Sequence, residues 1–210
     1  VQGYGLSEAP TATNCNPIQG DNRPGTIVLP LPGVDVRVVD VNDPTRIMPQ
    51  GEIGEMWLRS PQVMQGYHNR PQETEIVLRD GWLATGDIVK MDGDGYFTIV
   101  DRKKDLIKVS GFQVWPQEVE TVLSHHPFIY EAGVISAFDP TTGEKVIAWL
   151  VMEPEKTVTL DAVQEWCKKW LASYKKPQEI HFCERLPRSR LGKLLRRKLR
   201  EWYAAFAEHQ

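Results

Sequence analysis

A charged segment at Asp101–Asp105 (DRKKD) separates two parts of the chain whose sequence patterns predict different secondary structure. Because buried charges are costly unless they are paired, this segment is not expected inside a hydrophobic core. A strand-like run at 96–100 precedes it, and another apolar run follows Gly111. The pattern indicates a connection between two packed bodies. A solvated turn within one hairpin is the alternative that the segment alone leaves open.

Composition places few limits beyond those of a globular protein. The 210 residues allow one large domain or two small ones, and 41% hydrophobic with 25% charged residues is ordinary. A net charge of −3 gives no global reason to expect nucleic-acid or membrane partners. No apolar run approaches the roughly 20 residues of a transmembrane helix. Three widely spaced cysteines without a CxxC pair argue against disulfides and zinc, so we expect a cytoplasmic protein.

The part before residue 104 predicts a β-rich subdomain, either a small distorted barrel or a sandwich. Short apolar runs between Pro, Gly and Asn clusters predict strands at 26–29, 34–40, 53–59 and 96–100. Residues 9–25 favour a surface loop, and Pro71 favours a short helix over 71–79. Asp92–Gly95 indicates a hairpin, and Thr85–Asp87 indicates a tight turn.

The part from residue 104 onward alternates helical and strand patterns, which favours a compact α+β domain. Helices are expected between Pro116 and Pro127, at 160–172 and at 191–206. Strands are expected at 131–137, 145–152 and 179–182. The predicted fold class is therefore α+β, with domains at 1–103 and 104–210.

Three segments carry groups suited to nucleotide chemistry, although each has a simpler structural explanation. Tyr4–Glu8 offers an aromatic ring, a hydroxyl and a carboxylate that could hold Mg²⁺, but Ser-Glu is more typical of a helix cap. Asp87 could accept hydrogen bonds from ribose hydroxyls or cap its own turn. Lys193, beside Gly192, could meet charge on a phosphate or belong to a solvated helix face.

Other kinds of site have little support in the sequence. His125 and His126 have no third ligand at metal-binding spacing, so we give them no metal role. The basic segment 185–200 lacks the interleaved aromatic residues of a nucleic-acid-binding surface. No Walker loop, GxSxG elbow or HExxH motif is present.

Taken in order, these segments resemble the adenylate-forming superfamily, which includes acyl-CoA synthetases, luciferases and non-ribosomal adenylation domains. Five stretches in register carry the resemblance: Tyr4–Glu8, Gly51–Glu55, Gly81–Asp87, Asp101–Gly111 and Pro187–Lys193. Two segments, GEIGEMWLRSPQVMQGYHNRPQET and IVDRKKDLIKVSGFQVWPQEVE, are similar to segments of bacterial medium- and long-chain fatty acyl-CoA ligases. The resemblance implies an ATP-dependent, AMP-forming ligase that joins a carboxylic acid to CoA, with a fatty acid as the expected acid.

The resemblance also implies a role for each matched residue. In the first part, Tyr4 would stack on adenine, Ser7 would contact the α-phosphate, and Glu8 would hold Mg²⁺. Asp87 and Arg102 would bind the ribose of ATP or AMP. The same nucleotide site would include Gly5 and Ile99.

In the second part, Lys193 would be the adenylation lysine. Lys108 and Gly111 would serve thioester formation, with Gly111 leaving room for the pantetheine arm of CoA. Lys104 would be the hinge between the two domains, while Lys103 and Asp105 are expected only to keep that joint solvated.

The family's phosphate loop and most of its acyl pocket are expected upstream of Tyr4. We therefore expect the chain to be the C-terminal fragment of a longer protein and to be inactive alone. An adenylation domain that loads a carrier protein and a non-catalytic module that kept the fold remain as alternatives. The identity of the acid stays open because the acyl pocket lies upstream.

Overall fold

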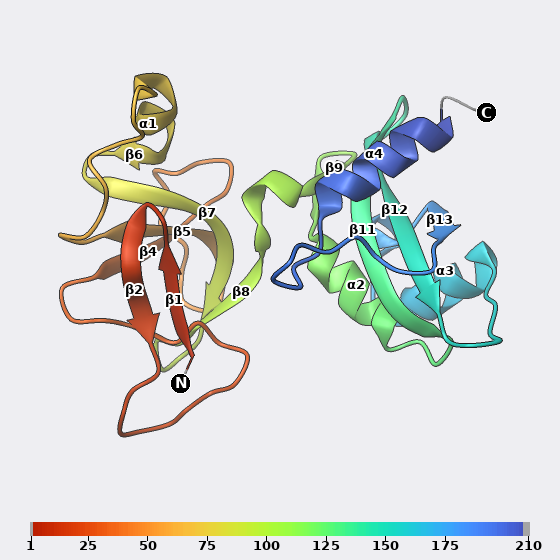
Figure 1. Ribbon diagram of the computed structural model, residues 1–210, viewed down its shortest axis with the longest axis horizontal. Coiled ribbons are helices and arrows are strands. Elements are labelled where there is room, and N and C mark those ends of the chain that lie inside the picture. Colours follow the sequence, from red (N-terminus) through yellow and green to blue (C-terminus); the bar gives the residue numbers. More distant parts are fainter. Residues whose placement is uncertain (1, 208–210) are drawn as a thin grey trace. The chain divides into compact units, whose positions relative to one another are not determined.

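The computed structural model describes residues 2–207, which form two compact units with their boundary between Lys104 and Asp105 (Figure 1). Val1 and Gln210, the outer ends of the predicted domains, lie outside the described residues. Sheets and a few short helices make up both units, so the α+β fold class is confirmed. Among residues 2–207, no helix has both the length and the apolar character that crossing a membrane requires.

Within the described residues, the first unit contains two sheets and one α-helix. Its three-stranded sheet has the order β1 (Gly3–Leu6), β2 (Ala9–Cys15), β3 (Leu29–Pro30). Its five-stranded sheet has the order β4 (Asp35–Val39), β5 (Ile53–Arg59), β7 (Trp82–Met91), β6 (Leu78–Arg79), with β8 (Phe97–Arg102) also paired to β7. The helix is α1 (Pro71–Val77), which begins at a proline as predicted.

Neither sheet closes on itself in the described part of the chain, so the barrel alternative is wrong. Strands β4 and β6 are the two ends of the five-stranded order, and they do not pair with each other. Instead, residues from both sheets share one hydrophobic core, which includes Tyr4, Ile27, Val38, Met56, Leu58, Val89 and Phe97. Packing of one sheet on the other therefore buries the apolar face that a barrel would have buried by closure.

Several local predictions in this unit are wrong. Of the strand expected at 26–29, only Leu29 lies in β3, and Leu78–Arg79, expected at the end of a helix, form β6. Two further errors have different reasons. Residues 9–15, expected in a loop, form β2, in which the buried Thr13 hydroxyl donates to Asn14 Oδ1 at 3.0 Å. A strand with buried polar residues shows no hydrophobic alternation, so its sequence resembled a loop. Thr85–Asp87, expected as a tight turn, lies inside β7, where Gly86 (φ +70°) marks a bulge against β5.

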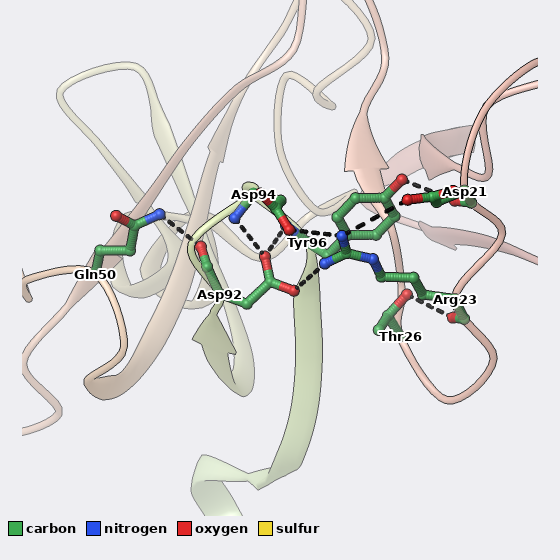
Figure 2. A network of polar contacts seen from close by, with 7 residues as sticks. All are labelled: Asp21, Arg23, Thr26, Gln50, Asp92, Asp94 and Tyr96. Atoms are coloured by element: carbon green, nitrogen blue, oxygen red, sulfur yellow. Dashed lines mark hydrogen bonds and ion pairs between the residues drawn. The ribbon is translucent and has the colours of Figure 1, made fainter.

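Arg23 ties the long segment between β2 and β3 to the β7–β8 hairpin (Figure 2). Its guanidinium lies 2.7 Å from Asp92 and 2.6 Å from Asp94, and 4.2 Å from the centre of the Tyr96 ring. Asp92 Oδ1 in turn accepts the amides of Asp94 and Tyr96, each at 2.9 Å. The hairpin predicted at Asp92–Gly95 is confirmed, and these contacts fix the turn that leads into β8.

The second unit is one sheet with helices on both faces. In the described residues the sheet has the order β10 (Phe112–Val114), β9 (Ile107–Val109), β12 (Gly143–Met152), β11 (Ile129–Asp139), with β13 (Glu179–Phe182) parallel to β12. The α-helices are α2 (Pro116–Ser124), α3 (Leu160–Lys168) and α4 (Arg196–Ala207). One short 3₁₀ turn lies at Ser173–Lys175, and another, Lys103–Asp105, spans the boundary between the units.

Strands β11 and β12 carry apolar residues on both faces, and each face meets different helices (Figure 1). The paired Val134 and Ala148 belong to the core shared with α2 and α3. The next pair, Ile135 and Ile147, belongs to the core shared with α4. Gly133 permits close packing of α4, because a Cβ there would lie 2.9 Å from Leu199 Cδ1.

All three helices of this unit were predicted, and α2 and α3 begin at the predicted residues, Pro116 and Leu160, but the other bounds differ. Helix α2 stops at Ser124 before Pro127, and α3 stops at Lys168 before the predicted end at Ala172. Helix α4 begins at Arg196 rather than at Leu191. Gly192 has φ +79°, and the backbone folds back into a bridge between Arg188 and Leu194, so the helix cannot extend through this loop.

Candidate functional site

Tyr4, Asp87 and Arg102 form one polar cluster in the first unit. The Tyr4 hydroxyl on β1 donates to Oδ2 of Asp87 on β7, and Arg102 Nε on β8 lies 2.7 Å from Oδ1 of the same carboxylate. The register of β7 and β8 places Asp87 opposite Arg102. The Asp87 side chain is fully buried, whereas that of Arg102 is 46% exposed. The structure thus brings together three residues predicted to contact a nucleotide.

Tyr4 is itself buried, and its ring belongs to the core of the first unit. Burial, followed by the Asp87 carboxylate, raises the pKa of the Tyr4 phenol well above its usual value, so the hydroxyl remains a donor at neutral pH. Ile99, also predicted to contact the nucleotide, packs against the same core. Because the Tyr4 ring and the Asp87 carboxylate are both buried, contact of either one with a nucleotide would require neighbouring side chains to move.

Gly5 and Ser7 have local structural explanations. A Cβ at Gly5 would lie 1.9 Å from the carbonyl oxygen of Thr11, so the β1–β2 hairpin requires glycine there. Ser7 is exposed in the turn between β1 and β2. Since this turn joins two strands, the helix-cap explanation of Ser7-Glu8 is wrong.

A cavity of about 270 Å³ opens beside this turn, and Glu8 lines it. Glu8 Oε1 accepts a hydrogen bond from the Tyr67 hydroxyl at 2.7 Å, which raises the pKa of Tyr67 to about 12. Thr85 and Gly86 line both this cavity and a second hollow of about 320 Å³ that Arg102 borders. Glu8 and Arg102 therefore face adjoining cavities that share the bulge of β7 as a wall.

Glu8 fits a magnesium ion only in one particular way. Within residues 2–207, no group of three His, Cys, Asp or Glu side chains is arranged to hold a metal by itself. Glu8 would supply a single carboxylate oxygen. That is the usual situation for Mg²⁺ in proteins, which takes one or two carboxylates and completes its shell with phosphate and water oxygens.

An ion pair in the same cavity was not predicted. Lys103 Nζ lies 2.7 Å from Oε2 of Glu55, whose side chain is only 3% exposed. The expectation that Lys103 only keeps a joint solvated is therefore wrong, because it compensates a buried carboxylate. The signal was Glu55 itself: a charge inside the apolar run of β5 needs a partner.

Asp105 departs from the same expectation. Its side chain is 8% exposed and lies 2.8 Å from Arg200 and 3.8 Å from Arg196, both on α4. The preceding residue, Lys104, is exposed at the end of the first unit. Within the charged segment, Asp101 and Asp105 are both buried, and Asp101 Oδ1 accepts the backbone amide of Arg102 at 2.7 Å. The solvated-turn alternative therefore holds only for part of the segment.

Lys108 and Gly111 lie on one hairpin of the second unit. Ser110 and Gly111 have φ +50° and +84° in the two-residue turn between β9 and β10, a conformation that favours glycine. A Cβ at Gly111 would have no atom within 4 Å, so within this unit the positive φ of the turn, and not steric crowding, favours glycine at this position. Lys108 has an exposed side chain, and its amide donates to Glu144 Oε2 at 2.6 Å.

Lys193 lies exposed in a small closed loop before α4. The amide of Ser189 donates to the carbonyl of Lys193 at 2.8 Å, and the amide of Lys193 donates to the Ser189 hydroxyl at 3.2 Å. Arg188 contacts the carbonyl oxygen of Gly192 and also pairs with Glu131 on β11. The loop therefore presents the ammonium group of Lys193 from a backbone that its own hydrogen bonds hold.

Two family models match the sequence, one in each unit. Residues 1–68 match the AMP-binding enzyme model, and residues 118–193 match the model of the AMP-binding enzyme C-terminal domain. The first match contains Tyr4 and Glu8, and the second ends at Lys193. The two models thus follow one another in the order that the sequence resemblance predicted.

Curated and solved relatives extend over nearly the whole chain. A long-chain-fatty-acid–CoA ligase of Yersinia pestis is 44% identical over 201 residues, which are 96% of this chain and 35% of the relative. The ATP-bound MatB structure from Rhodopseudomonas palustris is 35% identical, with a TM-score of 0.88 over 96% of this chain and 40% of its own. The anthranilate CoA ligase AuaEII, solved with anthranoyl-AMP, is 33% identical, with a TM-score of 0.81 over 99% of this chain and 39% of its own.

The chain accordingly spans little more than a third of the length of these relatives. The family models, the sequence identities and the shared fold all agree with the resemblance drawn from the five motifs. The chain belongs to the adenylate-forming superfamily of AMP-binding enzymes.

Proposed function

We propose that this chain is part of an ATP-dependent, AMP-forming acyl-CoA ligase that acts on a fatty acid. The observation that carries the proposal is the Tyr4–Asp87–Arg102 cluster next to the cavity that Glu8 lines. The ATP and the adenylate held by two solved relatives support a nucleotide ligand for the protein to which this chain belongs. The name of the Yersinia pestis relative supports a fatty acid, while the anthranilate ligase supports only a carboxylic acid.

The proposed reaction has two steps because a carboxylate is a poor electrophile. In the first step a carboxylate oxygen attacks the α-phosphorus of ATP, an acyl-AMP forms, and pyrophosphate leaves. In the second step the thiol of CoA attacks the acyl carbon, a thioester forms, and AMP leaves. Negative charge develops on different atoms in the two steps, so different cationic groups serve them best.

In the proposal, the first unit binds the nucleotide. Asp87 accepts hydrogen bonds from the ribose hydroxyls, Arg102 assists it, and Tyr4 offers its ring to adenine. Ser7, exposed in its turn, contacts the α-phosphate. Gly5 and Ile99 contribute backbone and apolar surface to the same site.

A magnesium ion would be held by Glu8 together with phosphate and water oxygens, and would neutralise charge on the phosphates. The Tyr67 hydroxyl, at 2.7 Å from Glu8, orients the carboxylate for this task.

The second unit supplies the residues that change between the two steps. Lys193 stabilises the charge of the adenylation step, and the hairpin with Lys108 and Gly111 serves thioester formation. We propose that Lys104, at the boundary between the units, is the hinge that allows the exchange. On this proposal, residues 1–103 are the last part of a large AMP-binding domain and residues 104–210 are its mobile C-terminal domain.

The test uses the whole protein in which this chain occurs. ATP–pyrophosphate exchange is measured with a panel of fatty acids of graded chain length and with aromatic acids such as anthranilate. Exchange that depends on a fatty acid supports the proposal, and exchange with aromatic acids alone would contradict its fatty-acid part. No exchange with any acid would favour a non-catalytic module.

The acceptor is tested separately. Thioester formation with CoA is compared with transfer to a phosphopantetheinylated carrier protein, and transfer to the carrier alone would make the protein a carrier-loading adenylation enzyme. The 210-residue chain by itself covers 35% of the Yersinia pestis relative, and we expect it to give no exchange above background.

A further inference from the structure

Both ends of the Lys193 loop are attached to β11, the last strand of the sheet order. At the beginning of the loop, Arg188 forms an ion pair with Glu131. At its end, Arg196, the first residue of α4, donates from Nε to the carbonyl oxygen of Val134 at 3.3 Å. The position of Lys193 within the second unit is therefore set by side-chain contacts with one strand, besides the bonds within the loop.

Arg196 shares its contact at Val134 with Glu120 on α2. Arg196 Nη2 lies 2.7 Å from Glu120 Oε2, and Glu120 Oε1 accepts the amide of Val134 at 2.8 Å. The backbone of Val134 on this edge strand is thus satisfied by two side chains instead of by another strand. The side chains of Arg196 and Glu120 are 16% and 14% exposed, so the loss of either one would remove an opposite charge from beside a largely buried charged group.

The same guanidinium group also faces the start of the unit. Asp105, the first residue after the boundary, lies 3.8 Å from Arg196 and 2.8 Å from Arg200. We call these four residues, Asp105, Glu120, Arg196 and Arg200, the arginine clamp. The clamp connects the residue after Lys104 to the loop that carries Lys193, through side chains that are mostly buried.

We propose that the arginine clamp positions Lys193 for the adenylation step, with Arg196 as its central positioning residue. The proposal rests on the proposed function, in which Lys193 is the adenylation lysine and Lys104 the hinge. A movement that begins at the hinge then carries the Lys193 loop as part of one rigid body. Because a displacement of about 1 Å can cost about 100-fold in rate, a loosened clamp slows adenylation although Arg196 need not touch a substrate.

The test compares Arg196→Met with Arg197→Met in the whole protein in which this chain occurs. Arg197 follows Arg196 on α4, but its side chain is 83% exposed and forms an ion pair with Glu201 at 3.4 Å, so it is a matched control. For Arg196→Met we expect kcat of ATP–pyrophosphate exchange to fall at least about 10-fold with KM for ATP within about twofold. Thioester formation from synthetic acyl-AMP should stay within about threefold, and Arg197→Met should resemble the wild type in both assays.

Hydrogen exchange supplies a structural measurement that does not depend on activity. The amides of Gly192, Lys193 and Leu195 bond within the loop, and they should exchange faster in Arg196→Met but not in Arg197→Met. Asp105→Asn keeps the Arg196–Glu120 pair and should show a weaker effect of the same kind. It serves as the second variant if Arg196→Met does not fold.

The possible outcomes distinguish a failure of the clamp proposal from a failure of the proposed function on which it rests. Equal losses in both steps, or an Arg196→Met protein that behaves like Arg197→Met, would overturn the clamp alone. A folded wild-type protein without any acid-dependent exchange would overturn the proposed function and, with it, the positioning role of the clamp.

Discussion

The hydroxyl of Tyr4 donates a hydrogen bond to the carboxylate of Asp87, which is fully buried and lies 83 residues further along the chain. The bond joins the small sheet of the first unit to its larger sheet, since Tyr4 lies on β1 and Asp87 on β7. It therefore contributes to the fold of the unit as well as to its candidate nucleotide site.

Replacing Tyr4 by Phe should destabilise the first unit. The substitution keeps the ring in the core but leaves Asp87 with Arg102 as its main charged partner. Loss of a buried hydrogen bond to a charged group costs about 1–3 kcal/mol, and we expect a decrease of this size in the free energy of unfolding. Urea unfolding monitored by a probe in residues 2–104 measures it, and an unchanged midpoint would mean that the bond adds nothing to stability.

The free energy of unfolding should also fall at alkaline pH, because two tyrosines of the first unit have raised pKa values. The pKa values of Tyr4 and Tyr67 are both raised, the latter to about 12, so the folded state holds these protons more tightly than the unfolded state. Their contribution is complete below the unfolded pKa of about 10 and is lost as the pH rises above it. Unfolding measured between about pH 9 and pH 11 should show a shallower decline in Tyr4→Phe and Tyr67→Phe than in the wild type. Because lysines titrate in the same range, the differences between the proteins, and not the wild-type slope, decide the outcome.

Lys103→Met should destabilise the protein more than Lys104→Met. The first change leaves the buried Glu55 carboxylate without its ammonium partner, whereas Lys104 is exposed. Because Lys103 is itself 39% exposed, water can replace part of the lost interaction, and we expect a cost of about 1–3 kcal/mol. Denaturant unfolding of both variants checks the difference, and equal midpoints would show that Glu55 does not need Lys103.

Two glycines of the candidate site should respond differently to substitution. Gly5→Ala places a Cβ 1.9 Å from a backbone oxygen and should cost about 1–3 kcal/mol or more, and Gly5→Asn should be no better. In Gly111→Ala the new Cβ has no atom within 4 Å, so the free energy of unfolding should fall by about 1–2 kcal/mol because of the positive φ alone. Since asparagine tolerates that conformation, Gly111→Asn should recover part of the loss in thermal unfolding, and a failure to recover would point to a contact beyond the turn.

Lys193→Ala should separate the two proposed steps. In the whole protein, it should reduce pyrophosphate exchange at least about 100-fold, because one charged group of the adenylation step is removed. Thioester formation from synthetic acyl-AMP should be largely unaffected. Equal losses in the two assays would contradict the role given to Lys193, and Arg197→Met again serves as the surface control.

The sequence predicted those elements whose apolar pattern is strong. Strands β5 and β13 have the predicted bounds, because Ile53–Arg59 and Glu179–Phe182 each form a continuous strand-like run. Strand β2 was missed because its buried residues include Thr13 and Asn14, which periodicity counts as surface. The start of α4 was missed because the basic residues around Lys193 do not show where a loop ends.

In the candidate site, too, the sequence predicted what local motifs record and missed what depends on distant residues. The motifs identified Tyr4, Asp87 and Arg102 as members of one site, and pairing of β7 with β8 brings the last two together. The motifs could not show the ion pair of Lys103 with Glu55 or that of Asp105 with Arg200, because the two members of each pair lie far apart in the sequence. Long-range ion pairs depend on tertiary packing, which no local pattern records.

The alternation of β11 and β12 between two cores limits which insertions and deletions related sequences can carry. One extra residue within β11 would move Val134 and Ile135 to opposite faces, and each would then meet the wrong helices. The turn at 140–142 lies outside both cores, so a change in its length would not exchange the faces of either strand. Its backbone bonds, from Thr141 and Thr142 to Asp139 and from Ser110 to the Thr142 carbonyl, are the contacts that such a change would affect. Length variation among homologues should therefore collect in this turn, while both strands keep a constant number of residues.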